Sequence, residues 1–365
     1  MAAFAREHAD RLAFYQYLQW LADEQLAAAG TRCFQLGLGV GLYADLAVST
    51  DRGGAETWAA QRVYAMSASV GAPPDDFSPQ GQDWGLPPLI PHALAECGYE
   101  PFIAVLRQNM RHPGALRIDH VMGLMRLFWV PPGGSAADGA YVRYPFEELL
   151  GIAALESRRN NCMLIGEDLG TVPDEVRQAM QRFGLLSYRP MLFQRGAMGE
   201  FLPPTAYPRS ALVAVSTHDL PTLQGYWRGR DVEVRAALGH HGSPEQVRQQ
   251  RDARAGDRWQ LLTALQRQGL LPPGVGTNAA ALPELTPPVV AAVHRFLARC
   301  PSQVMVVQCE DLLGVAEQAN LPGTTDEHPN WQRRLPLSLE QLRLQPLVTD
   351  VAQALAQEQR TSRPA

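Results

Sequence analysis

Three carboxylates of this sequence each follow an apolar, strand-like run of residues. Asp119 comes after LRI, Glu167 after MLIG, and Asp219 after ALVAVSTH. Such runs are typical of strands buried in a parallel sheet, where only the strand exits reach water, so acids at successive exits can meet in one pocket. A nucleophile, a proton shuttle and an acid that holds hydroxyl groups together suit glycoside chemistry. The three acids are therefore the candidate catalytic residues.

Arg117 lies two residues before Asp119 on the same predicted strand. Alternation along a strand points both side chains to one side of the sheet. A guanidinium beside a carboxylate keeps the carboxylate ionised, as a nucleophile must be. A structural salt bridge at a strand end explains the same pair, and both interpretations stay open.

Glu167 and Asp168 are adjacent acids, so their side chains point to opposite sides. Only one of them readily faces the pocket, while the other can cap the following turn or helix. Partial burial near other carboxylates would raise the pKa of Glu167 and let it hold a proton for the leaving oxygen. We assign the proton shuttle to Glu167 and a capping role to Asp168.

His218 and Asp219 form a pair that can grip two neighbouring sugar hydroxyls. A divalent metal site is the competing interpretation, because His and Asp at strand exits also bind metal ions. No His-x-His or His-x-x-x-His spacing occurs in the sequence, which favours the sugar.

The elements that must position these acids alternate between strand and helix. Six strand candidates occur, and they lie within CFQLGLGVGLYADLAV, LRIDH, MLIGEDLG, LSYRPMLF, ALVAVSTHD and VMVVQCEDLLG. Helices are predicted at about 6–29, 101–111, 146–159, from Pro173 onward, and within 244–269. This order predicts an α/β fold of the (β/α)8 TIM-barrel type, here incomplete, with about six of eight strands and the first strands missing.

One domain is expected to hold the whole site. We predict a catalytic barrel over 1–355 and a frayed tail over 356–365. Two inserted loops, at about 71–91 and 315–335, are rich in Pro, Gly and polar residues and carry Asp75, Trp84 and Asn330. The first is predicted to lack regular structure and to bind ligand, and the second to wall the site or to be a solvated acidic loop.

Composition excludes several classes of protein. The 365 residues carry a net charge of −5 with a pI near 6.0, so no basic field for nucleic acid is expected. There is no lysine, which excludes a Schiff-base lysine, a pyridoxal phosphate anchor and a Walker-type loop. The five scattered cysteines, and the absence of any signal-peptide or membrane-spanning stretch, indicate a cytoplasmic protein that does not interact with a membrane.

Five ordered blocks of this sequence resemble the amylomaltase family of 4-alpha-glucanotransferases. The blocks are GAPPDDFSPQGQDWGLPP, RIDH, GEDLG, STHD and PGTTDEHPNW, and the similarity runs from GLYADLAVSTDRGGAETW to HPNWQRRL. The resemblance implies a retaining transferase of α-1,4-glucan segments between maltooligosaccharides, with no metal or organic cofactor. It implies that Asp119 is the nucleophile, Glu167 the general acid/base and Asp219 the acid that stabilises the transition state.

The resemblance also implies a set of substrate-binding residues, and this chain departs from the family in one respect. The implied substrate-binding residues are Arg117, His120, His218, Trp84, Asp75, Asp45 and Asn330. Family members carry an N-terminal part that supplies the first barrel strands, so we expect that this chain lacks that segment and could need it as a partner. Two alternatives stay open: a catalytically silent fragment or glucan-binding module, and an α-1,4-glucan hydrolase.

Overall fold

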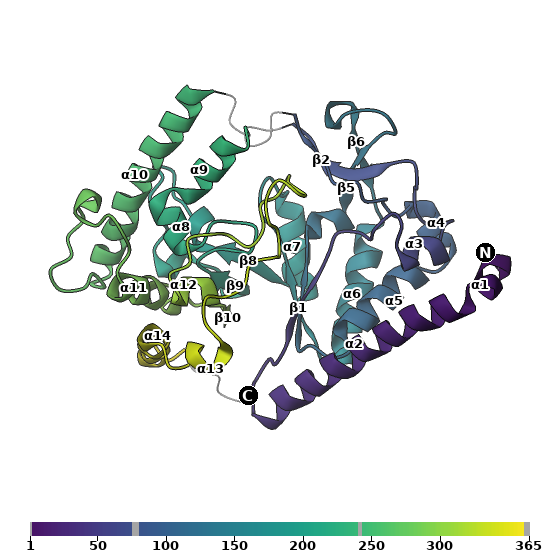
Figure 1. The fold of residues 1–365 in the computed structure, drawn as a ribbon, viewed down its shortest axis with the longest axis horizontal. Coiled ribbons are helices and arrows are strands. Elements are labelled where there is room, and N and C mark those ends of the chain that lie inside the picture. Colours follow the sequence, from purple (N-terminus) through teal and green to yellow (C-terminus); the bar gives the residue numbers. More distant parts are fainter. Residues whose placement is uncertain (1, 75–79, 240–242, 361–365) are drawn as a thin grey trace. The chain divides into compact units, whose positions relative to one another are not determined.

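The computed structural model describes residues 2–74, 80–239 and 243–360. The chain divides into two compact units (Figure 1), one up to Leu186 and the other from Ser187 onward. Each unit contains three parallel strands with helices packed beside them, and each is described by itself below.

The first unit is built on three parallel strands in the order β1-β4-β7. They are β1 (Tyr43–Leu46), β4 (Ala115–Ile118) and β7 (Met163–Gly166). In this register Ile118 pairs with Leu46 on one side and with Gly166 on the other. The residues that follow Ile118 and Gly166, which are Asp119 and Glu167, therefore leave the sheet side by side.

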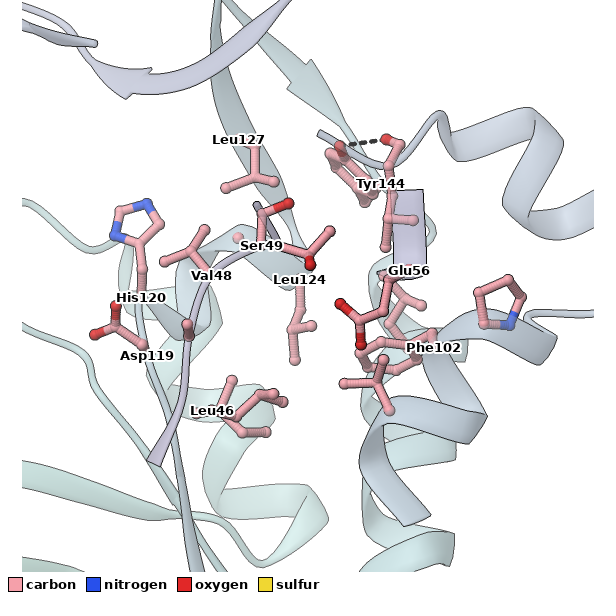
Figure 2. Close-up of a pocket in the computed structure, with 18 of the residues that line it drawn as sticks. Leu46, Val48, Ser49, Glu56, Phe102, Asp119, His120, Leu124, Leu127 and Tyr144 are labelled. Atoms are coloured by element: carbon pink, nitrogen blue, oxygen red, sulfur yellow. Dashed lines mark hydrogen bonds between the residues drawn. The ribbon is translucent and has the colours of Figure 1, made fainter. Parts of the chain in front are cut away.

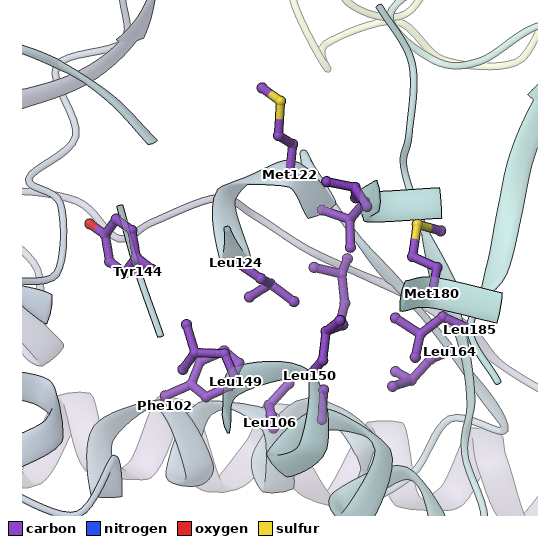
Figure 3. Packing of buried hydrophobic residues seen from close by; sticks show 14 of the residues in the cluster. Phe102, Leu106, Met122, Leu124, Tyr144, Leu149, Leu150, Leu164, Met180 and Leu185 are labelled. Atoms are coloured by element: carbon purple, nitrogen blue, oxygen red, sulfur yellow. The ribbon is translucent and has the colours of Figure 1, made fainter. Parts of the chain in front are cut away.

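Helices of the first unit pack their apolar faces into one core. They are α4 (Pro91–Glu96), α5 (Glu100–Met110), α6 (Phe146–Asn160) and α7 (Asp174–Phe183). The unit also contains the short helix α3 (Ala55–Ala59) and 3-10 turns at Val121–Leu124 and Ala136–Asp138. Figure 3 shows Leu106 of α5, Leu150 of α6, Leu164 of β7 and Met180 of α7 in that core. The sequence predicted α5 and α6 nearly to the residue, and it predicted the start of α7.

The first unit begins with α1 (Ala2–Glu7) and the long α2 (Ala9–Gln35), drawn in purple in Figure 1. No residue of the 27-residue α2 is buried, and several of its large apolar side chains, among them Phe14, Tyr17 and Trp20, are more than half exposed. Asp23 of α2 accepts a hydrogen bond from Arg111 and contacts His112, the two residues that follow α5.

A four-stranded antiparallel sheet, in the order β3-β2-β5-β6, also belongs to the first unit. Its strands are β2 (Ser69–Ala72), β3 (Gln82–Asp83), β5 (Arg126–Val130) and β6 (Ala140–Arg143). The prediction that 71–91 lacks regular structure was therefore wrong. Gly71 explains part of the error, because a side chain there would meet the carbonyl oxygen of Gln82 at 2.0 Å, and glycine lets the strands approach.

The second unit has three further parallel strands, in the order β8-β9-β10. They are β8 (Leu186–Pro190), β9 (Ala211–Ala214) and β10 (Val304–Met305). Its helices are α8 (Leu223–Arg228), α9 (Arg230–Ala237), α10 (Pro244–Arg267), α11 (Pro287–Ala298), α12 (Cys309–Leu312), α13 (Leu339–Leu342) and α14 (Pro346–Gln357). Trp227 and Phe296 are fully buried in its core.

The end of the chain is anchored as far as the structure describes it. Glu358 accepts hydrogen bonds from Arg295 and Arg299 of α11, and Arg360 donates to the carbonyls of Ala298 and Cys300. Glu358 and Arg360 thus find partners on α11 and directly after it, and the fraying of 356–365 stays a prediction. Residues 361–365 lie outside the described residues.

Candidate functional site

Arg117 connects two of the predicted acids in the first unit. Its side chain is buried, and it donates to both oxygens of Asp45 at 2.7 Å while a second nitrogen lies 2.7 Å from Asp119 Oδ1. Burial disfavours the charged guanidinium, but the charges of Asp119 and Asp45 outweigh it and raise the pKa of Arg117. Arg117 and Asp119 lie on the same side of the strand, as the alternation predicted.

Glu167 is only 9% exposed, and two backbone amides hold it. Leu169 N donates to Oε1 at 2.6 Å and His120 N donates to Oε2 at 3.0 Å. Burial, aided by the nearby charge of Asp119, raises the pKa of Glu167 to about 7, although the two amides and Arg117 oppose the rise. Glu167 can therefore be protonated near neutral pH, while Arg117 favours the ionised form of Asp119.

Asp168 points away from Glu167 and is buried. Its Oδ2 accepts a hydrogen bond from Arg177 Nε of α7 at 3.1 Å. The two adjacent acids thus have different partners, and Asp168 is balanced by a guanidinium rather than by a helix N-terminus.

His120 and Trp84 lie against each other near Asp119. His120 has a left-handed backbone (φ 47°), and its ring meets the indole of Trp84 edge to face at 5.6 Å. Burial lowers the pKa of His120 to about 4, so the imidazole is neutral at physiological pH and can both donate and accept. Trp84 Nε1 donates to Gln82 Oε1 at 3.0 Å, which leaves its ring to contact other groups.

A cavity of about 350 Å³ opens beside Asp119 in the first unit. Figure 2 shows Asp119 and His120 at one end, Glu56 and Tyr144 at the other, and Leu124 between them. Tyr144 donates its hydroxyl to the carbonyl of Leu89 at 2.6 Å. Sequence reasoning did not group Glu56 or Tyr144 with the acids, because Glu56 lies in the helix α3 and Tyr144 follows β6, a strand that was not predicted.

Asp219 lies in the second unit, five residues beyond the end of β9. Asn320 Nδ2 donates to its Oδ1 at 2.6 Å, and His218 Nε2 is 3.1 Å from its Oδ2. Its backbone N donates to Thr217 Oγ1 at 3.1 Å. The side chain of Asp219 is still one-third exposed, so its oxygens can also reach a ligand.

Asn330 and Trp331 occupy different environments in the second predicted loop. Asn330 Oδ1 accepts from Leu321 N at 2.9 Å, and its Nδ2 donates to Thr324 Oγ1 at 2.9 Å, so its amide holds the loop together. Trp331 has a left-handed backbone (φ 60°), is 65% exposed, and its ring lies 5.1 Å from that of His218. A role for Asn330 in substrate binding stays a prediction.

The sequence matches a known family over most of its length. The model of glycoside hydrolase family 77, described as 4-alpha-glucanotransferase, matches residues 1–339. The chain belongs to this family. A 4-alpha-glucanotransferase of Haemophilus influenzae is 45% identical over 91% of this chain and 47% of its own length, and one of Mycobacterium tuberculosis is 41% identical over 93% and 46%.

Solved structures show the fold of this family 77 chain. The amylomaltase of Corynebacterium glutamicum matches with a TM-score of 0.86 at 36% identity, over 94% of this chain and 50% of that one. An amylomaltase of Streptococcus agalactiae, solved with acarbose, matches with a TM-score of 0.72 at 18% identity. The predicted fold class, a TIM-type barrel that is incomplete here, is confirmed. The chain spans about half the length of the Haemophilus influenzae and Mycobacterium tuberculosis relatives and of the Corynebacterium glutamicum amylomaltase.

Some predictions about the family 77 site lie beyond the described residues. Asp75 falls in 75–79, which the structure does not describe. Within the described ranges, no three His, Cys, Asp or Glu side chains gather as metal ligands would, and no helix there is long and apolar enough to cross a bilayer. Asn320 is the main residue that sequence reasoning missed, because it follows no strand.

Proposed function

We propose that this chain carries the catalytic machinery of a 4-alpha-glucanotransferase that moves α-1,4-glucan segments between maltooligosaccharides in the cytoplasm. Asp119 attacks the anomeric carbon while Glu167 protonates the glycosidic oxygen, and a covalent glycosyl-enzyme forms. Glu167, now ionised, takes a proton from the 4-hydroxyl of the acceptor glucan as that oxygen attacks the same carbon. Asp219 stabilises the distorted sugar in the transition state, and no metal or organic cofactor takes part.

The environment of Glu167 beside Asp119 carries this proposal. Glu167 has a pKa of about 7 and can hold the proton of the general acid, whereas Asp119 is held by the Arg117 guanidinium and can act as the nucleophile. The strand register also supports retention. Neighbouring strands lie about 4.8 Å apart, a spacing that can accommodate the roughly 5–5.5 Å between carboxyls that retaining enzymes need.

Substrate binding is assigned to residues around these acids. We propose that Arg117 and Asp45 set the charge and position of Asp119, and that His120 and His218 hold sugar hydroxyls. Trp84, Asp75 and Asn330 complete the proposed glucan-binding loops. Transfer exceeds hydrolysis when the acceptor site binds sugar tightly and limits the access of water.

The direct test is the disproportionation of maltotriose by the purified chain. Wild-type chain should yield glucose and longer oligosaccharides, and Asp119→Asn should abolish both products because the amide cannot attack the anomeric carbon. Asp174→Asn, at an exposed residue of α7, is the matched control and should keep full activity. Full activity of Asp119→Asn would contradict the assignment, and glucose without longer products would indicate a hydrolase.

A second candidate is favoured by the exposed helix α2. A 27-residue helix with no buried residue and several exposed aromatic side chains is typical of a surface that another polypeptide covers. We infer that the chain alone has no transferase activity, or only binds glucan, and becomes active when such a polypeptide docks on α2. The test supplies the part of the Haemophilus influenzae relative that this chain does not match. Activity that appears only in the mixture supports this candidate, and activity of the chain alone contradicts it.

A further inference from the structure

Asp219 is held by a residue from the other end of the second unit. Asn320 is 101 residues away in sequence, and its Nδ2 donates to Asp219 Oδ1 at 2.6 Å. We propose that Asn320 is a positioning residue that fixes the orientation of the Asp219 carboxylate for sugar binding in the transition state. This inference rests on the proposed function.

Each oxygen of the Asp219 carboxylate has a different neighbour. Oδ1 faces the amide of Asn320, and Oδ2 faces Nε2 of His218 at 3.1 Å. The two contacts define the plane of the carboxylate, which a single contact would leave free to rotate. Because the side chain is one-third exposed, the carboxylate is also accessible to a sugar hydroxyl.

Asn320 is itself fixed on both sides. Its backbone N donates to the carbonyl of His218 at 3.2 Å, and its carbonyl accepts from Nε2 of the buried Gln318 at 2.6 Å. The Asn320 side chain therefore acts from a rigid segment that is also bonded to the residue next to Asp219. A contact between two anchored segments preserves geometry better than one between mobile surface side chains.

The hydrogen bond to Asp219 requires an uncharged donor. An amide donates to a carboxylate without adding a positive charge beside it, so the contact does not weaken the attraction between Asp219 and the positive charge that develops on the sugar. Aspartate at 320 would have the same shape but would face Asp219 with a second carboxylate. The pair would then need a shared proton, as two acids this close do not both ionise readily.

The test compares Asn320→Ala, Asn320→Asp and the control Asn278→Asp. Asn278 accepts a hydrogen bond from Ala280 N, which aspartate can keep, so the control makes the same chemical change with activity unchanged. Asn320→Ala should lower kcat for maltotriose disproportionation about tenfold to a hundredfold with a smaller change in KM, as expected for a lost hydrogen bond to a charged group. Asn320→Asp should be less active than Asn320→Ala at neutral pH and should regain activity as the pH falls.

The pH profile separates positioning from simple damage to the loop. Damage would affect the Ala and Asp variants alike at every pH, and that result, or an unchanged kcat in Asn320→Ala, would overturn the inference. Crystal structures of wild type and Asn320→Ala provide a readout that needs no activity. We expect the Asp219 side chain to change rotamer in the variant, and an unmoved side chain would overturn the inference even if the wild type proved inactive and the proposed function failed.

Discussion

The two units hold their acids by different physical means. In the first unit, Asp119 and Glu167 follow paired residues of adjacent strands, and backbone amides and a buried guanidinium hold their carboxylates. In the second unit, Asp219 lies beyond its strand, and side chains of His218 and Asn320 hold it. The first arrangement changes protonation through burial, whereas the second fixes orientation through contact with a loop.

This difference predicts which changes each unit tolerates. Burial acts on Glu167 from all sides, so the chemical identity of its carboxyl matters more than any single neighbour. Asp219 depends on a few polar contacts, so a neighbour can be as important as its own side chain. The following substitutions test this contrast.

The largest effect is expected for Glu167→Gln in the first unit. The amide cannot deliver a proton, and kcat should fall about 10²- to 10⁴-fold, the usual contribution of general acid–base catalysis. Wild-type kcat/KM should fall as the pH rises through about 7, because Glu167 then loses its proton. Kinetics of maltotriose disproportionation across pH measure both effects, with Glu148→Gln as the exposed control. Wild-type activity that stays constant well above pH 7 would contradict the role of Glu167 as the acid.

The second unit also contains a buried acid, Asp311, to which no catalytic role is assigned. The effect of its burial can be compared with that of Glu167. Its Oδ1 accepts from Leu223 N at 2.7 Å, and burial raises its pKa from 3.8 to about 7. The folded state therefore keeps a proton that the unfolded state loses, and stability falls as the pH rises from about 3.8 to about 7. The total loss is on the order of 4 kcal/mol at 1.36 kcal/mol per pKa unit.

Asp311→Asn should remove this loss while keeping the acceptor for Leu223 N. The variant should become more stable than wild type as the pH rises through that window, and the difference should level off above it. Urea unfolding at several pH values measures the difference, and Asp252→Asn on exposed α10 should show none. A difference between variant and wild type that stays constant across this window would show that folding does not raise the pKa of Asp311.

Sequence reasoning predicted the acids of the first unit better than the contacts around Asp219 in the second unit. Strand exits are visible as apolar runs that end in an acid, and the alternation correctly placed Arg117 beside Asp119. The Asn320 contact was not predictable, because it depends on how two segments 101 residues apart fold back on each other. The short β2 and β3 strands were missed because the segment that contains the end of β2 and all of β3, 71–91, is rich in proline and glycine and resembles a loop, although Gly71 is needed for a close strand approach.

A smaller effect is expected for Arg117→Lys in the first unit. Lysine keeps the positive charge but loses the planar fork that contacts Asp45 and Asp119 at once. One lost charge-assisted contact should lower kcat/KM about tenfold. Arg107→Lys loses the same planar fork in its salt bridge with the buried Glu156, so it is the matched control and should leave the kinetics unchanged. A fully active Arg117→Lys would show that a positive charge alone holds Asp119. The planar guanidinium would then no longer distinguish the first unit from the second.

The smallest effect is expected for Trp331 in the second unit, which presents an exposed ring beside His218. If the ring stacks on the acceptor sugar, Trp331→Ala should raise the KM for an acceptor glucan about two- to tenfold with little change in kcat, a magnitude typical of one aromatic contact.

The left-handed backbone at Trp331 provides a control for this prediction. Trp331→Gly removes the same ring but adopts the positive φ freely, so it should be more stable than Trp331→Ala by about 1 kcal/mol. If stacking matters, both variants lose acceptor affinity equally and Trp331→Phe recovers it. If only Trp331→Ala loses affinity, the ring has no role in binding, and the backbone conformation beside Asp219 is what the loop contributes.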